Sequence, residues 1–144
     1  MDKNAYFWQV MDGKLPPPGA AATLGIRFTH IDADAGTIET AFEASAAFTN
    51  PAGHVQGGFL AAMLDDAMGP AAFTLLDEGA FAPTLEMKVS FVRPAHAGPL
   101  IAEGNVVHQS RRFIHAEGRL TTEHGQLIAT ATATLVISQQ KEDP

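Results

Sequence analysis

The chain has 144 residues, of which 46% are hydrophobic and 17% are charged, and its formal net charge is -7. This composition predicts one ordinary globular domain over residues 1–144 and excludes disordered and fibrous proteins. The acidic balance argues against a nucleic-acid binder, and the absence of cysteine excludes disulfides, thiolate nucleophiles and thiolate metal sites.

Residues 1–19 are predicted to form an N-terminal lid and a stiff connector. The aromatic segment 3–11 (KNAYFWQVM) can form one or two helical turns, and we expect it to plug the end of the core. Three consecutive prolines in Leu15–Gly19 disfavour both helix and sheet ladder. We see no secretory signal and no apolar run of the roughly 20 residues that a membrane helix needs. A cytoplasmic protein without membrane attachment is therefore expected.

Two strands and one long helix are predicted next. The strands lie near residues 23–33 and 36–44, and the turn at Asp32–Gly36 makes them a hairpin. Helical spacing of apolar residues then predicts a helix from Gly57 to about Leu76, which Pro70 should kink or disturb. The residues expected on its apolar face are Leu60, Met63, Leu64, Ala67, Ala71 and Leu75.

The remainder of the chain reads as four antiparallel strands. Residues 85–91 and 129–135 alternate between apolar and polar side chains, which is typical of strands with one buried face. Further strands are expected near 99–109 and 112–123. This order predicts an α+β protein in which a curved sheet of about six strands wraps one helix. Its edge strands and open groove predict side-by-side dimers, and two dimers can pack further into a tetramer.

Opposite its apolar face, the helix carries small residues and one carboxylate. The members of this stripe are Gly58, Ala61, Ala62, Asp65, Gly69 and Ala72. A ligand can approach small residues closely, and crowding suits Asp65 to act as a base or nucleophile. The alternative is a solvent-facing stripe in which Asp65 adds solubility. Asp66, about 100° further round the helix, is expected to be solvated or salt-bridged.

The start of the helix is a candidate oxyanion hole. Gly57 and Gly58 place side-chain-free residues where unpaired amides and the helix dipole favour negative charge. A substrate carbonyl has room to reach these donors. The alternative is a tight turn that merely precedes a helix.

The motif around this helix start resembles a known family. The run NPAGHVQGG at residues 50–58, followed by Leu64-Asp65, is similar to the hotdog-fold acyl-CoA thioesterases of the phenylacetate-degradation and acyl-CoA thioesterase-13 type. Residues 83–95 also resemble the next strand of that family, and the resemblance covers roughly residues 20–138. It implies a hotdog fold, hydrolysis of an acyl-CoA to free acid and CoA, and a substrate site at a dimer interface.

The resemblance also implies a role for each matching residue. Asp65 would be the general base or the nucleophile. The amide of Gly57, helped by Gly58, would polarise the thioester carbonyl. Asn50 would place the thioester or the water. Thr84, contributed by the partner subunit, would orient the water.

Two residues near the helix start decide whether the site has an imidazole group. The family has His before the glycine pair, whereas this chain has Gln56, which can hydrogen-bond but cannot shuttle a proton. His54, two residues earlier, is the available imidazole. A mechanism that rests on Asp65 and the helix N-terminus needs neither.

Three arginines are candidate ligands for the phosphates of CoA, because a guanidinium fork suits phosphate. They are Arg93, Arg111 and Arg112, and ordinary surface arginines are the alternative. The six histidines lack the spacing of a helical metal pair. We therefore expect no metal and no cofactor, since CoA is part of the substrate.

Two other functions stay open at this point. A hotdog hydratase or dehydratase pairs an acid with a catalytic His, and Gln56 counts against it. A non-catalytic acyl-CoA-binding module is the alternative from a different class. An aromatic or medium-chain acyl group is expected, and the choice between CoA and acyl-carrier-protein substrates stays open.

Overall fold

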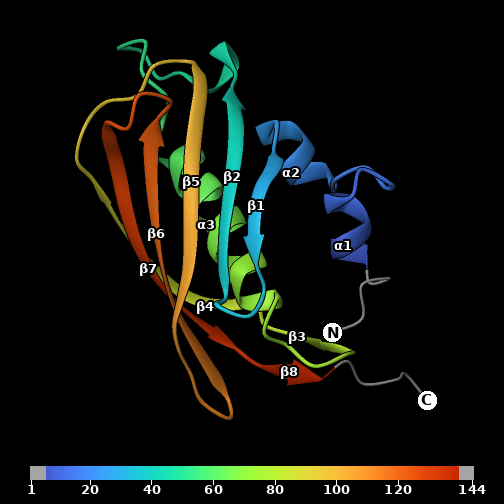
Figure 1. The fold of residues 1–144 in the computed structure, drawn as a ribbon. Coiled ribbons are helices and arrows are strands. Elements are labelled where there is room, and N and C mark those ends of the chain that lie inside the picture. Colours follow the sequence, from blue (N-terminus) through green and yellow to red (C-terminus); the bar gives the residue numbers. More distant parts are fainter. Residues whose placement is uncertain (1–5, 140–144) are drawn as a thin grey trace.

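The computed structural model describes residues 6–139. At its centre lies one long helix, α3 (Gly57–Phe73), wrapped by a six-stranded antiparallel sheet of order β1-β2-β5-β6-β7-β4 (Figure 1). The strands are β1 (Arg27–Asp32), β2 (Thr37–Ala44), β4 (Thr84–Phe91), β5 (Gly98–Gln109), β6 (Phe113–Thr122) and β7 (Leu127–Val136). This confirms the predicted α+β hotdog fold.

Five short elements accompany the helix and sheet: α1 (Tyr6–Met11), α2 (Gly19–Leu24), the 3-10 helix η1 (Ala46–Phe48), and the paired strands β3 (Ala80–Phe81) and β8 (Ser138–Gln139). The helical turns expected near the N-terminus are present as α1, although residues 1–5 lie outside the described residues. The predicted start of the first strand at residue 23 is wrong, because α2 extends to Leu24 and β1 begins at Arg27. Pro18 caps α2, the alanines at 20–22 continue it, and Gly25 ends it with φ 69° in the left-handed region.

The long helix ends slightly earlier than predicted. It runs through Pro70 to Phe73, and the amide of Leu75 then bonds the carbonyl of Ala72, a tighter i to i+3 turn. Because proline has no N–H, the carbonyl of Asp66 lacks its usual intrahelical donor. The helical spacing of apolar residues in the sequence therefore extends about one turn beyond the end of α3.

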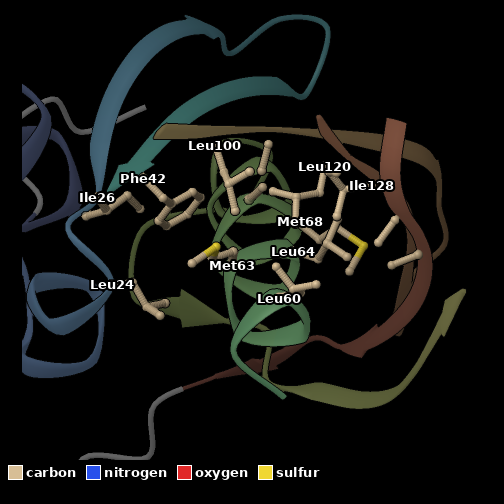
Figure 2. Close-up of a cluster of buried hydrophobic side chains, with 14 of the residues drawn as sticks. Leu24, Ile26, Phe42, Leu60, Met63, Leu64, Met68, Leu100, Leu120 and Ile128 are labelled. Carbon is tan, nitrogen blue, oxygen red and sulfur yellow. The ribbon is translucent and has the colours of Figure 1, made fainter. Parts of the chain in front are cut away.

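The core lies between α3 and the inner face of the sheet (Figure 2). Met63 and Leu64 on the helix are 0% exposed, and Leu75 alone of the predicted apolar face is only half-buried. Burying one such side chain stabilises the fold by about 1.5–3 kcal/mol. The sheet contributes Leu100, Leu120 and Ile128, while Leu24, Ile26 and Phe42 close the side near α2.

Two facing glycines let the helix approach the sheet backbone. Gly104 of β5 pairs with Gly118 of β6 in the register of the sheet. A Cβ atom at Gly104 would overlap the backbone carbonyl of Ala67 and lie 2.9 Å from the amide nitrogen of Met68. At Gly118 the closest atoms would be the side-chain atoms Cδ2 of Leu64 at 3.1 Å and Cγ of Met68 at 3.2 Å, and the carbonyl oxygen of Glu103 would lie at an ordinary contact distance of 3.4 Å. Gly104 therefore marks a direct contact between helix backbone and strand backbone.

Strand β4 forms one free edge of the sheet and carries exposed apolar side chains. Leu85 is 63% exposed, Phe91 is 54% exposed, and the adjacent Val92 is 60% exposed. The alternating pattern had predicted that Leu85 and Phe91 are buried with Met87 and Val89. An open strand edge with apolar side chains favours pairing with another chain.

Candidate active site

Asp65 is half-buried on α3 and accepts a hydrogen bond from β4. The Thr84 hydroxyl donates to Oδ1 of Asp65 at 2.9 Å within one chain. The expectation that Thr84 reaches the site from the partner subunit is therefore wrong for this pairing. A carboxylate held through one oxygen keeps the other oxygen available to accept a proton from water.

A β-bulge directs Thr84 toward the helix. In the ladder between β4 and β7, Thr84 pairs with Leu135 and Glu86 pairs with Thr134, so Leu85 is an extra residue on β4. Leu135 is 1% exposed and faces the helix. Without the extra residue, strict alternation would place Leu85 at this inward position and Thr84 on the outer face. The bulge thus brings a hydroxyl, instead of an aliphatic side chain, to Asp65.

The helix face around Asp65 is open in one chain. A Cβ atom at Gly58 or at Gly69 would meet nothing within 4 Å. Ala72, which we had placed on the same stripe, is 0% exposed and belongs to the core. The stripe of small residues is therefore an open surface from Gly58 past Asp65 to Gly69, and a ligand or second chain can approach it.

The N-terminus of α3 offers free backbone donors. Gln56 occupies the N-cap position, and its side chain makes no capping hydrogen bond. Neither the Gly57 nor the Gly58 amide donates a hydrogen bond to another described residue. A Cβ atom at Gly57 would lie 3.1 Å from the ring of Phe91, so glycine also leaves room for that ring. The glycine pair therefore has the features expected of an oxyanion hole.

Asp65 and Gly57 of one chain do not act on the same carbonyl group. Eight residues of helix separate them by about 12 Å along the axis. The free amides at a helix N-terminus also point along that axis, away from Asp65. The carboxylate and the candidate oxyanion donors are thus both present, but they lie apart within one chain.

The loop before α3 is organised by Asn50. Its side-chain Oδ1 accepts hydrogen bonds from the amides of Ala52 at 3.0 Å and His54 at 3.1 Å. The ring of His54 lies edge-on to the ring of His96, with centroids 5.2 Å apart, whereas Gln56 is exposed. The sequence did not indicate this imidazole pair. The Asn50 oxygen is occupied by the loop, so only its amide group can donate to a substrate.

The three candidate arginines lie at two opposite ends of the sheet. Arg93 donates through Nη1 to the carbonyl of Leu127 at 3.2 Å, whereas the carbonyl of Arg112 accepts from the amide of Ile137 at 2.8 Å. These contacts flank the 10-residue strand β7, which spans roughly 30 Å. Arg111 and Arg112 are exposed together. One chain therefore does not bring all three arginines to one small ligand.

Asp66 is not the solvated or salt-bridged acid that we expected. It is half-buried, and its Oδ2 is buried without a hydrogen-bond partner among the described residues. Burial, and to a smaller degree the neighbouring Asp65 carboxylate, raises the pKa of Asp66 from 3.8 to about 6. Desolvation penalises the charged form of a buried acid. Asp66 therefore costs stability when it is ionised.

Replacing Asp66 by Asn should stabilise the protein at neutral pH and not in acid. The raised pKa means that the folded state binds the proton more tightly than the unfolded chain does. Its contribution is fully present below pH 3.8 and is lost as the pH rises through about 6. Allowing for solvent screening, Asp66→Asn should gain on the order of 1 kcal/mol at pH 7.5. Urea unfolding at pH 4 and pH 7.5 measures this difference, and equal effects at both pH values would contradict it.

Asp34→Asn is the matched control, because Asp34 lies exposed in the turn between β1 and β2. We expect this variant to follow the pH dependence of the wild type. At pH 7.5 both substitutions remove one negative charge, so a general charge effect would appear equally in the two variants at that pH.

Outside the site, the described part of the chain has a surface hollow but neither a metal cluster nor a membrane-spanning helix. A hollow of about 820 Å³ lies on the outer face of the sheet, and neither Asp65 nor Thr84 lines it. Within residues 6–139, no three His, Asp or Glu side chains gather closely enough to hold a metal ion. In that same part of the chain no helix is long and apolar enough to cross a membrane.

The fold and the site together define a hotdog protein that carries an acid on the open face of its central helix. The sequence model of the thioesterase superfamily matches residues 52–129. This is more than half of the chain, and the chain therefore belongs to the thioesterase superfamily. It is an enzyme of the thioester hydrolase class.

Solved structures of similar proteins agree with this assignment. A phenylacetic acid degradation-related protein of Ralstonia eutropha JMP134 is 40% identical, with a TM-score of 0.86 over 91% of this chain and 98% of that chain. A thioesterase family protein of Silicibacter pomeroyi is 30% identical, with a TM-score of 0.82 over 93% and 99%. The PaaI protein of the Escherichia coli phenylacetic acid degradation operon, 21% identical over 94% of each chain, shares the fold with a TM-score of 0.79.

Proposed function

We propose that this protein is an acyl-CoA thioesterase whose active site is shared by two copies of the chain. The observation that carries the proposal is the hydrogen bond from Thr84 to Asp65 beside an open helix face. A positioned carboxylate with one free oxygen can activate water. The oxyanion donors that it needs are too far away in its own chain, so a second chain must supply them.

Antiparallel pairing of two β4 edges supplies these donors. Thr84, which holds Asp65, begins β4, whereas Phe91, which touches Gly57, ends it. A two-fold axis through the middle of the paired strands places the first residue of one strand against the last residue of the other. Gly57 of the partner subunit then arrives beside Asp65. The exposed apolar side chains of β4 favour this pairing.

The proposed dimer also unites the arginines. Arg112 lies at the end of the sheet where β4 begins, because its carbonyl bonds Ile137, just after β7 ends. Arg93 lies two residues beyond the end of β4. Antiparallel pairing therefore brings Arg93 of the partner subunit to the same end as Arg111 and Arg112. These guanidinium groups can hold the phosphates of CoA.

Hydrolysis follows from this arrangement. Thr84 holds one carboxylate oxygen of Asp65, and the other accepts a proton as the water oxygen attacks the thioester carbon. The amide of the partner subunit's Gly57, helped by the partner's Gly58 and by the side-chain amide of the partner's Asn50, stabilises the negative charge on the carbonyl oxygen. The C–S bond then breaks, the CoA thiolate takes the proton back from Asp65, and the acid leaves. Direct attack by Asp65 on the carbonyl, followed by hydrolysis of the anhydride, is the alternative route.

The acyl group that we propose is aromatic or medium-chain. One similar protein is described as related to phenylacetic acid degradation, which supports an aromatic acyl group. Phe48 and Phe59 stack on each other with centroids 4.2 Å apart, and Met63 is 0% exposed, so these side chains contribute to the core. We therefore do not place the acyl site on these three side chains. We place this activity in the cytoplasm, as a homodimer or a pair of dimers, and it requires no metal or cofactor.

An acyl-CoA panel with a thiol-reactive dye tests the activity. We expect CoA release that depends on the acyl group. Binding without release would favour the acyl-CoA-binding module, and addition of water to an enoyl-CoA without release of CoA would favour a hydratase. The position of Gln56, exposed at the N-cap without a proton to shuttle, supports hydrolysis over the hydratase.

Complementation between two inactive variants tests the shared site. Gly57→Pro removes the donor amide at the first helical position, where the backbone tolerates proline and the Phe91 ring must shift by a few tenths of an ångström, and Asp65→Asn removes the acid. Heterodimers of the two variants, isolated through different tags, contain one site with both native groups. They should recover about half of the wild-type kcat, since one of two symmetric sites is rebuilt. Heterodimers as inactive as either parent would show that each site belongs to one chain.

A further inference from the structure

We infer that Leu85 is a specificity-determining residue that forms one wall of the acyl site. This inference rests on the proposed function and concerns only which acyl groups are accepted. Leu85 is 63% exposed on β4, the strand that forms a free edge of the sheet. It also sits directly beside Thr84, which holds Asp65.

The bulge that places Thr84 is also what exposes Leu85. Thr84 pairs with Leu135 and Glu86 pairs with Thr134, which leaves Leu85 as the unpaired extra residue. Bulges at sheet edges redirect a side chain next to a functional site. One backbone feature therefore delivers a polar group to the acid and an aliphatic group to the adjacent open edge.

The proposed dimer gives the exposed side chain an apolar counterpart. With Thr84 opposite Phe91 of the partner subunit, Leu85 lies near the end of the partner's strand, where Phe91 and Val92 are 54% and 60% exposed in one chain. The thioester carbonyl lies between Asp65 and the partner's Gly57, which touches the partner's Phe91. An acyl tail leaving that carbonyl meets apolar walls from both chains, which suits an unsubstituted aromatic or aliphatic group.

Changing the size of residue 85 should change the preferred acyl group. Leu85→Phe should lower kcat/KM for long or aromatic acyl-CoAs by about tenfold relative to acetyl-CoA, because the wall moves inward. Leu85→Ala should move the preference toward bulkier acyl groups. The readout is the ratio of kcat/KM between acyl groups, which a loss of folded enzyme does not alter.

Two controls separate the side chain from its surroundings. Val107 is 60% exposed on β5, which β6 and β7 separate from β4 in the sheet, and Val107→Ala should leave the acyl preference unchanged. Deleting Leu85 removes the bulge but leaves Thr84 next to Glu86, still opposite Leu135. This deletion should keep hydrolysis and show the same altered preference as Leu85→Ala.

Two results would overturn the inference while leaving thioester hydrolysis intact. In one, both Leu85 variants keep the acyl preference of the wild type. In the other, Val107→Ala shifts that preference as much as the Leu85 variants do. A wild-type protein that binds acyl-CoAs without releasing CoA would instead contradict the proposed function. In that case calorimetric Kd values for the same acyl series test Leu85: a selectivity that moves with residue 85 supports it, and an unmoved selectivity overturns it.

Discussion

Asp65→Asn is expected to lower kcat for acyl-CoA hydrolysis by about 10²–10⁴-fold, the range for losing a general base. The amide of Asn keeps an oxygen that can accept the Thr84 hydroxyl, so the 2.9 Å contact and the fold should persist. What is lost is the oxygen that takes the proton from water. Steady-state CoA release measures the change, and calorimetric binding of the acyl-CoA should remain.

Asp66→Asn is the matched control for this experiment. It makes the same chemical change one residue further along α3, at a side chain that does not bond Thr84. We expect this variant to keep most of its activity. If the two variants lost activity equally, charge on the helix rather than the positioned carboxylate would be responsible.

Labelled water distinguishes the two roles that Asp65 can have. In a single turnover in H₂¹⁸O, a general base directs the label into the released acid only. A nucleophile forms an anhydride, and water that attacks this anhydride at the Asp65 carboxyl carbon places the label in the peptide that contains Asp65 and leaves the acid of the first turnover unlabelled. Mass spectrometry of that peptide over several turnovers reads the difference.

Gly104→Ala is expected to destabilise the protein by about 3 kcal/mol or to prevent folding, because overpacking against backbone has no flexible group to absorb it. The new methyl group would overlap the carbonyl of Ala67, and α3 would have to move away from β5. Urea unfolding at fixed protein concentration measures the loss, since a dimer's stability depends on concentration.

Gly118→Ala provides the graded comparison. The two glycines face each other in the ladder, but at Gly118 the new methyl would meet the end of Leu64 and Cγ of Met68, at 3.1 and 3.2 Å. Flexible side chains can shift by a few tenths of an ångström, so a loss of about 1 kcal/mol is expected. Equal losses in both variants would contradict the proposed contact between helix and strand backbones.

Most of the fold could be predicted because the spacing of apolar residues along the chain specifies its helix and strands. The helical spacing around Leu64 and the alternation around Ala131 correspond to α3 and β7. The errors occur where one residue breaks a period. Leu85 was expected in the core because alternation in 85–91 is regular in sequence, and nothing in that run signals a bulge. Helix α2 was missed because it is only one or two turns long.

The candidate site was predictable in its members and not in its arrangement. Asp65, Gly57 and Thr84 were all named from a motif, and the structure shows a hydrogen bond from Thr84 to Asp65 that the motif did not predict. Which chain each group comes from depends on how a helix and a strand edge lie relative to each other. The burial of Asp66 is likewise a property of its neighbours, since adjacent carboxylates look alike in sequence.

The sequence alone determined that a long helix with one acid among small residues is wrapped by antiparallel strands, because helical and strand periods are local properties of the chain. Only the tertiary structure decided that Thr84 meets Asp65 in the same chain and that Leu85 is exposed. Those outcomes depend on strand register. A single extra residue in a ladder reverses which side chains face the acid.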